Sequence, residues 1–394
     1  MARSEIPFNP AVLGWARGRR RLSEEHVARR LGVTPERIVA WESGKASPTV
    51  VQARKLAHFY DRPFLEFLSP TLPEIQPPRL APDFRFHREP PSDVEQVVLE
   101  SVHTWAEEQR LNAIDLYEEI GDAPPRFPEA LHASLDDSPE VVAAQIRGAV
   151  GPPIRELQLE LKSADRDKFP TILRRAFEAQ GLLVLKQSGI GRARTRGICL
   201  YDDVLPVIVF GNESPGAQAF TLAHEFGHVV LGASAVSGTP RFTYTHGGSV
   251  GKRIEGWCNT FAAAFLMPAD AVRAHPSAPR GLVEDISDEQ LNALAKRFCV
   301  SRHAMLVRLV SLGLVDPWFY WRIKRPAFLR EESEYEGFGR APYYGSRFRN
   351  SLGDRYTGLV IEAVETGRIG FQSAAEFMGT KNVRHFLEIR NNFA

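Results

Sequence analysis

The chain has 394 residues, 43% of them apolar and 25% charged, and its formal net charge is +1. This length is too great for one ordinary core, and this composition is typical of a soluble globular protein, so two or three domains are expected. The sequence holds no run of about 18 apolar residues, no apolar signal-peptide core and only three cysteines. We therefore expect a cytoplasmic protein without a membrane span or a disulfide framework.

The first part of the chain is basic. Residues 10–62 hold 11 Lys and Arg against 5 Asp and Glu, a net charge of +6 that leaves −5 for the rest of the chain. A basic segment on an acidic body favours an anionic partner for that segment, and nucleic acid is the leading candidate.

Four short helices are expected between residues 9 and 60, with a glycine turn between the second and the third. Ser23 caps the second helix and Gly32 ends it. Thr34 caps the third helix and Gly44 ends it. Helix, glycine turn and helix form the arrangement that lets the second helix of the pair enter a DNA major groove.

The stretch LSEEHVARRLGVTPERIVAWESGKASPTVVQARKLAHFY resembles the XRE (phage Cro/C1-type repressor) helix-turn-helix family. The matching positions are Ala28, Gly32, Ile38, Trp41, Glu42, Gly44, Lys45 and Pro48. That resemblance implies that three residues would face base edges, namely Glu36, Arg37 and Ala40. The same resemblance implies that Ser43 and Lys45 would lie near phosphate. The resemblance implies double-stranded DNA as a partner and a homodimer on a palindromic site.

Two features depart from the family pattern. The family usually has Gln where Glu24 stands, and that Gln helps to hold a phosphate, whereas a glutamate would repel one. Pro35 and Ala40 offer little hydrogen-bonding readout of bases. The alternative is a small helical bundle that makes only protein contacts.

Residues 70–91 hold seven prolines and are expected to form a semi-rigid linker. This linker joins the helix-turn-helix domain, residues 1–69, to a second domain over residues 92–315. Helices are expected at 93–121 and 138–151 in that domain, and neither carries chemistry of its own.

From residue 181 the pattern changes to short apolar runs of strand length, followed by the helical stretch TLAHEFGHVVLG. His224 and His228 lie four residues apart on one helix face and would converge on one point. Glu225, beside them, could hold a water molecule on a metal bound at that point.

A catalytic zinc site also needs a third protein ligand and an open position. Glu255, in the apolar helical stretch IEGWCNTFAAAFLMP, supplies a carboxylate. Asn259 lies on the same face and would hydrogen-bond a ligand histidine. The rival third ligands, which lack such apolar helical flanks, are Asp202, Asp203 and Glu213.

HEFGH together with E-x-x-x-N-x-F-A-A-x-F-L-M-P resembles the ImmA/IrrE family of metallopeptidases, over about residues 165–315. The resemblance implies a gluzincin-like ligand set of His224, His228 and Glu255, with Glu225 as the general base. It implies zinc as the cofactor, with manganese as the alternative. Family members cleave or inactivate helix-turn-helix repressors, often in stress responses, which implies a repressor or a toxin as the protein substrate.

The oxyanion formed during peptide hydrolysis also needs a hydrogen-bond donor. Tyr244 and His246, in the glycine-rich stretch GTPRFTYTHGGSVG, are candidates because of their proximity in sequence alone. The alternative is that both are ordinary loop residues.

Residues 316–394 comprise an Arg- and aromatic-rich segment, whose rings we expect to pack rather than to stack on bases, and a helical C-terminal module. The expected fold class is α+β: an all-α helix-turn-helix domain, a zincin-like peptidase domain with a small sheet and an HExxH helix, and a helical C-terminal region. The leading function is a DNA-binding transcriptional regulator fused to a zinc endopeptidase. The alternative is a non-enzymatic repressor or antitoxin whose peptidase-like domain senses or binds a partner.

Overall fold

The structure of the chain is a computed structural model. It describes residues 8–20, 22–60, 62–72, 92–150, 158, 161, 163–233, 235–237, 250–335 and 343–393. The chain divides into two compact units, one composed mainly of Met1–Arg79 and the other mainly of Val98–Ala394. The described part of the first unit is helical, and the second unit combines helices with a four-stranded sheet. The expected α+β fold class with a helical N-terminal domain is therefore confirmed.

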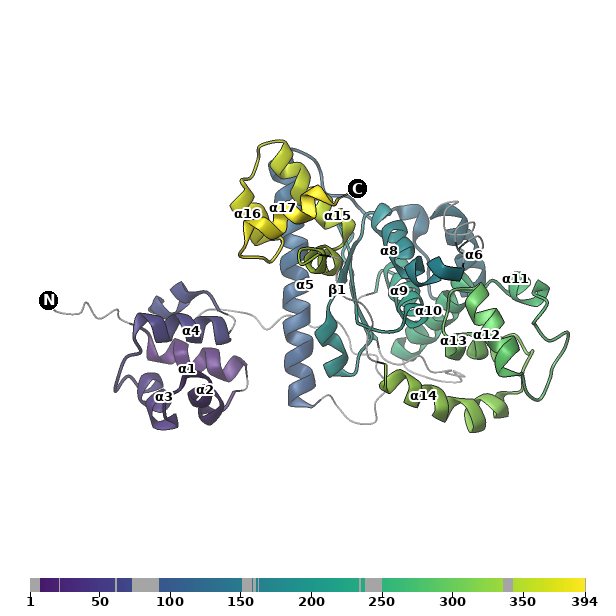
Figure 1. Cartoon of the computed structure of the whole chain (residues 1–394), viewed down its shortest axis with the longest axis horizontal. Coiled ribbons are helices and arrows are strands. Elements are labelled where there is room, and N and C mark those ends of the chain that lie inside the picture. The colour runs from purple at the N-terminus through teal and green to yellow at the C-terminus, as the bar shows by residue number, and fades with distance from the viewer. Residues whose placement is uncertain are drawn as a thin grey trace. The chain divides into compact units, whose positions relative to one another are not determined.

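In residues 8–72, as far as the structure describes them, the N-terminal unit comprises four helices and a short 3₁₀ helix (Figure 1). Their bounds are Pro10–Arg19 (α1), Glu24–Leu31 (α2), Pro35–Glu42 (α3), Val50–Tyr60 (α4) and Phe64–Leu68 (η1). The Ser23 hydroxyl accepts a hydrogen bond from the backbone N–H of His26 and so caps α2. Gly32 ends α2 with a φ of +71°, in the left-handed region that glycine adopts at little cost. The helix-turn-helix arrangement predicted for α2 and α3 is confirmed.

Apolar side chains from all four helices and η1 form the core of this unit. Its buried members include Val12, Leu13, Val27, Ile38, Trp41, Leu56, Tyr60 and Phe67. Burial of Ile38 and Trp41 turns the opposite face of α3 toward solvent, because residues three apart lie on one side of a helix.

Arg17 ties three of these helices together. Its guanidinium donates to both carboxylate oxygens of Glu42 at 2.7 and 2.8 Å and to the backbone carbonyl of Leu22 at 2.7 Å. It also lies 2.7 Å from a carboxylate oxygen of Glu24. The glutamate that departs from the XRE pattern at position 24 therefore has a structural partner on α1.

The second unit is organised around a sheet with the strand order β1-β3-β2-β4. The strands are Leu183–Lys186 (β1), Gly197–Leu200 (β2), Val207–Phe210 (β3) and Ala235–Ser237 (β4). β1 pairs with β3 in parallel, and β2 pairs antiparallel with both β3 and β4. Every residue of β2 and β3 is buried, which indicates that both faces of the sheet are covered.

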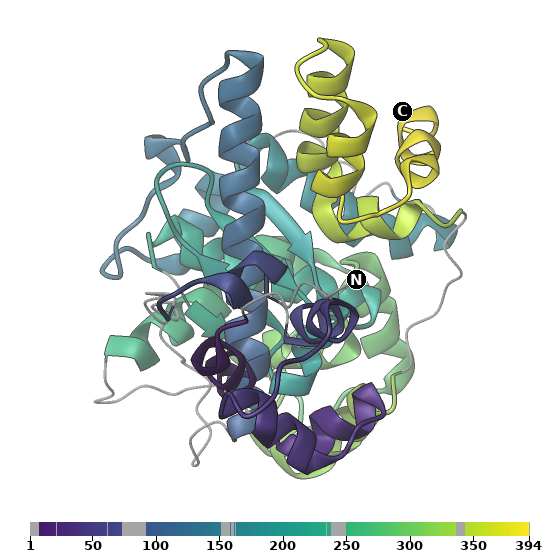
Figure 2. The ribbon, with the colours of Figure 1, turned by 90° about the vertical axis from the view of Figure 1, so that its left-hand side faces the viewer.

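One face of the sheet packs on helices from before β1 and from after β3 in the chain. These helices include Phe169–Ala179 (α8), Pro215–Val230 (α9), Val250–Leu266 (α10), Pro139–Ala149 (α6), Asp288–Arg297 (α12) and Arg302–Ser311 (α13). The other face packs on a long helix and on the C-terminal helices, which are Asp93–Ile120 (α5), Ser346–Glu365 (α15), Phe371–Phe377 (α16) and Val383–Asn391 (α17). Figure 1 shows α5 and α15 on one side of β1 and α8, α9 and α10 on the other, and Figure 2 gives a second view of the same layers.

The remaining helical elements connect these layers. They are Glu129–Leu131 (η2), Ser163–Lys168 (η3), Ser188–Ala193 (η4), Ala269–Ala274 (α11), Phe319–Lys324 (η5) and Arg325–Ser333 (α14). Among the helices that the structure describes, none combines the length and the apolar character that a membrane crossing needs.

The C-terminal helices share one core with α5 and the sheet. Leu352, Tyr356 and Val360 of α15 are buried in the same cluster as Leu185 of β1 and Val209 of β3. The boundary expected between residues 315 and 316 therefore does not separate two cores. In the Arg- and aromatic-rich segment, Phe319 and Tyr320 are packed as expected, whereas Trp318 and Trp321 are exposed.

Candidate metal centre

α9 and α10 carry the candidate site. α9 begins after Ser214 with Pro215 at its first position, where the missing backbone N–H is no loss. The two helices pack closely at Gly227, because a Cβ atom there would lie 3.1 Å from Phe261 and 3.4 Å from Cys258. This close approach brings the polar side chains of α10 to those of α9.

His224, His228 and Glu255 converge between the two helices. The Nε2 atoms of the two histidines lie 3.2 Å apart. The Glu255 carboxylate oxygens lie 3.4 Å from Nε2 of His224 and 3.1 Å from Nε2 of His228. All three side chains are buried, and one ligand atom from each lies within 4.8 Å of the others.

Burial and mutual charge set the protonation of this group. Burial raises the pKa of Glu255, but the two histidines outweigh it and lower that pKa to about 2. Burial lowers the pKa of His224, whereas Glu255 outweighs this effect and the net pKa is raised. For His228, burial prevails over Glu255 and the pKa is lowered. A carboxylate and at least one neutral imidazole are therefore favoured together, and these are ligand forms for a divalent metal.

The donor set fits zinc. Zinc takes imidazole nitrogen and carboxylate oxygen as ligands, and a catalytic zinc site has three protein ligands and one open position. Two imidazole nitrogens and one carboxylate, buried and within reach of one another, meet that requirement.

Glu225 lies against the sheet rather than in the ligand group. It is fully buried, and its side chain fills the space that a Cβ atom on residue 197, at the start of β2, would need. Burial raises the pKa of the Cys199 and Cys258 thiols, and the charge of Glu225 raises both further. The Cys199 thiol of β2 and the Cys258 thiol of α10 therefore stay neutral near the Glu225 carboxylate.

The other residues predicted around the metal fall into three groups. Asn259 is close enough to His224 to contribute to its raised pKa. The rival third ligands have other partners: Asp202 pairs with Arg110, Asp203 accepts from Tyr201, and Glu213 accepts from Thr221. Tyr244 and His246 lie outside the described residues.

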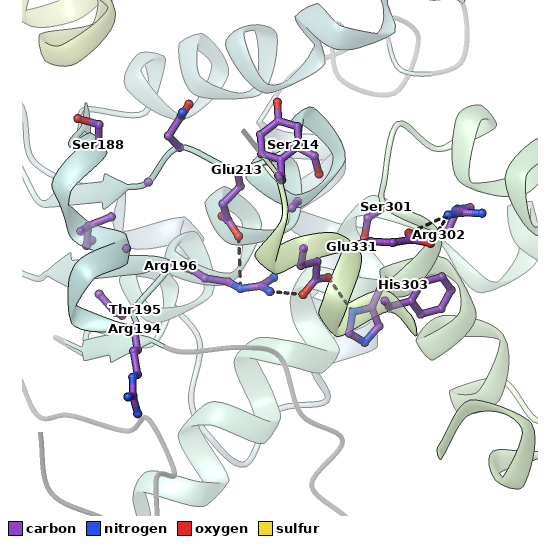
Figure 3. Close-up of a pocket in the computed structure, with 18 residues that line it drawn as sticks. Ser188, Arg194, Thr195, Arg196, Glu213, Ser214, Ser301, Arg302, His303 and Glu331 are labelled. Atoms are coloured by element: carbon purple, nitrogen blue, oxygen red, sulfur yellow. Dashed lines mark hydrogen bonds and ion pairs between the residues drawn. The ribbon is translucent and has the colours of Figure 1, made fainter. Parts of the chain in front are cut away.

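A pocket of about 690 Å³ lies at the N-terminal end of α9 (Figure 3). A chain of charged contacts runs through it, from Glu213 to Arg196 at 3.3 Å, on to Glu332, and from Glu332 to His303 at 2.8 Å. Burial raises the pKa of Glu213. This cluster could not be predicted from the sequence, because its members come from four separate segments without a shared motif.

Two family models match the chain, one in each of its two compact units. The family model described as an IrrE N-terminal-like domain, which is a peptidase family, matches residues 190–310. The family model described as helix-turn-helix matches residues 13–67. The chain therefore carries a helix-turn-helix domain followed by an IrrE-like domain. A search of curated proteins found no match.

The IrrE-like domain, as matched, contains the complete candidate centre and the pocket's Arg196 and Glu213, but not β1. The match begins within η4 and ends within α13. The resemblance to XRE and ImmA/IrrE proteins predicted from the sequence is therefore confirmed at the level of the two families.

The helix-turn-helix domain presents the residues expected to face DNA on α3 and just after it. Four of them are exposed, namely Glu36, Arg37, Ser43 and Lys45, and Ala40 is half-buried. Their exposure leaves these side chains accessible to a DNA groove.

Proposed function

We propose that the protein is a DNA-binding transcriptional regulator whose IrrE-like domain is a zinc endopeptidase acting on a repressor or another partner protein. The observation that carries this proposal is the buried group of His224, His228 and Glu255, inside a segment that matches a peptidase family. Glu225 lies beside His224 on α9. Two imidazoles and one carboxylate would hold the zinc ion.

In this proposal a bound zinc ion supplies Lewis acidity at the scissile carbonyl. Glu225 accepts a proton from the attacking water as its oxygen adds to the carbonyl carbon. Glu225 then delivers that proton to the nitrogen of the leaving amine as the C–N bond breaks. Asn259 would orient His224 by a hydrogen bond, which is the role that an outer hydrogen-bond partner plays at metal sites.

The helix-turn-helix domain would direct the peptidase to chromosomal sites. Arg37 and Lys45 are exposed cations placed to meet bases and phosphate, and a homodimer would read a palindrome. The helix-turn-helix match and the basic charge of residues 10–62 support this part of the proposal.

The test compares three chains by metal content and by proteolysis. Glu255→Ala should lose zinc, because it removes one of three ligands, whereas Glu225→Gln should keep zinc and lose cleavage, because an amide cannot accept the proton. Glu362→Gln, an exposed site on α15, is the matched control and should resemble the wild type.

Cleavage is measured by labelling new protein N-termini in cells that express each chain. New termini present with the wild type and with Glu362→Gln, but absent with Glu225→Gln, support the peptidase. Equal sets of termini with the wild type and Glu225→Gln would instead favour a non-enzymatic regulator that senses or binds a partner.

A further inference from the structure

We propose that Gly197 positions the Glu225 carboxylate, and that the missing side chain at the start of β2 forms the slot in which this carboxylate lies. This inference rests on the proposed function for its catalytic meaning. A Cβ atom built on Gly197 would lie 2.6 Å from both Cγ and Cδ of Glu225 and closer still to Oε1. Separations this short do not occur between carbon atoms that are not bonded. Any larger residue at position 197 therefore forces either the Glu225 side chain or one of the two backbones to move.

The strand cannot yield easily at this point. Gly197 pairs with Phe210 on β3 and with Ser237 on β4, so the strand is held on both edges. The carbonyl of Arg196 accepts from the N–H of Gly211 at 3.0 Å, and the Thr195 hydroxyl donates to the carbonyl of Gly197 at 3.1 Å.

The Arg196 side chain, which lies in the pocket, also holds the backbone next to Gly197 in place. Its guanidinium lies between Glu213 and Glu332, as the dashed contacts in Figure 3 show. The backbone on the N-terminal side of Gly197 is therefore fixed by both its main chain and its side chain.

The helix is held equally firmly. A Cβ atom at Gly216 would lie 2.5 Å from the backbone nitrogen of Ser301, so the start of α9 already touches the start of α13. Gly227 holds the last turn of α9 against α10 in a similar way, because a Cβ atom there would lie 3.1 Å from Phe261. With both backbones fixed, the part of the contact that can move is the side chain of Glu225.

A methyl group at position 197 should therefore expel the Glu225 carboxylate from its slot without moving the metal ligands. The ligands come from α9 and α10, and neither helix has to shift. Gly197→Ala should keep zinc and lose the proton transfer that Glu225 provides, a loss on the order of 100-fold or more in cleavage rate.

The test is a double-mutant cycle that needs no substrate. Gly197→Ala, Glu225→Ala and the combination are compared with the wild type by thermal unfolding and by zinc content in the full chain. We expect Gly197→Ala to lower the Tm when Glu225 is present and to have no effect when residue 225 is alanine, because the shorter side chain leaves room for the methyl group. Gly191→Ala is the control, since a Cβ atom there meets nothing within 4 Å.

Equal Tm losses from Gly197→Ala in both backgrounds would overturn the inference, because the clash would then lie elsewhere. If Gly197→Ala alone does not fold but the combination does, the inference is supported. Cleavage by the zinc-loaded Gly197→Ala chain at the wild-type rate would also overturn it, whereas wild-type cleavage by Glu225→Gln would overturn the proposed function and leave the steric result standing.

Discussion

Replacing Arg17 with methionine should destabilise the helix-turn-helix domain selectively. Arg17 and Glu42 are largely buried, with side-chain exposures of 17% and 14%, and Arg17 also bonds Glu24 and the Leu22 carbonyl. Removing one partner of a fully buried ion pair costs about 3–5 kcal/mol. Because both groups keep some contact with water, we expect a cost of about 2–4 kcal/mol. A domain of about 60 residues has a free energy of unfolding of about 3–9 kcal/mol, so this loss is a large share of it.

The measurement is hydrogen exchange by mass spectrometry on the full chain, with peptides from α1 to α4 compared with peptides from α9. Arg17→Met should speed exchange in α1 to α4 and leave α9 unchanged. Arg37→Met is the matched control, since Arg37 is exposed and its replacement should cost less than about 0.5 kcal/mol. Arg17→Met combined with Glu42→Met should cost less than the single change, because no buried carboxylate is left without its cation. Unchanged exchange in Arg17→Met would refute the role given to this ion-pair cluster.

Three further outcomes are expected. Glu24→Gln should tighten binding of duplex DNA about 5-fold in fluorescence anisotropy, since it removes a negative charge from the position where XRE-type proteins usually have a phosphate-holding Gln. The cost is about 1 kcal/mol or less in the partly exposed pair with Arg17. In the metal-free protein the pKa of Glu255 is lowered to about 2 from 4.5, so its carboxylate stabilises the fold above about pH 4.5. This contribution is lost as the pH falls from 4.5 to about 2, and urea unfolding of Glu255→Gln should be less acid-sensitive across that window. A chain truncated after residue 315 should be insoluble or zinc-free, because it loses the helices that cover one face of the sheet; a soluble, zinc-loaded fragment would contradict this.

The parts of the site that the sequence revealed are those fixed by local geometry. His224 and His228 share a helix face by their spacing alone, and Glu255 is marked by its place in an apolar helix. The caps at Ser23 and Gly32 likewise define α2 without knowledge of the rest of the fold. In each case a 3.6-residue period or a terminal residue carries the information.

The parts that the sequence did not reveal depend on which segments meet. The apposition of Gly197 and Glu225 arises because β2 lies over α9, and nothing in either segment alone encodes that contact. The pocket's chain from Glu213 through Arg196 to Glu332 joins residues more than a hundred positions apart. Ion pairs between separate segments leave no periodic pattern in the sequence. Glu213 was therefore predicted as a rival metal ligand, whereas in the structure it pairs with Arg196.

The apolar strand sequences nevertheless indicate that further segments must pack on the sheet. The runs LVLK and VIVF are continuous rather than alternating, and strands of this kind are apolar on both faces. A strand with two apolar faces needs two covers, and the helices around the metal centre supply only one. The second cover has to come from segments outside the peptidase-like motifs, and α5 together with α15 to α17 supplies it. The C-terminal helices therefore contribute to the metal centre indirectly, because with α5 they cover the face of the sheet opposite to the one that packs on α9.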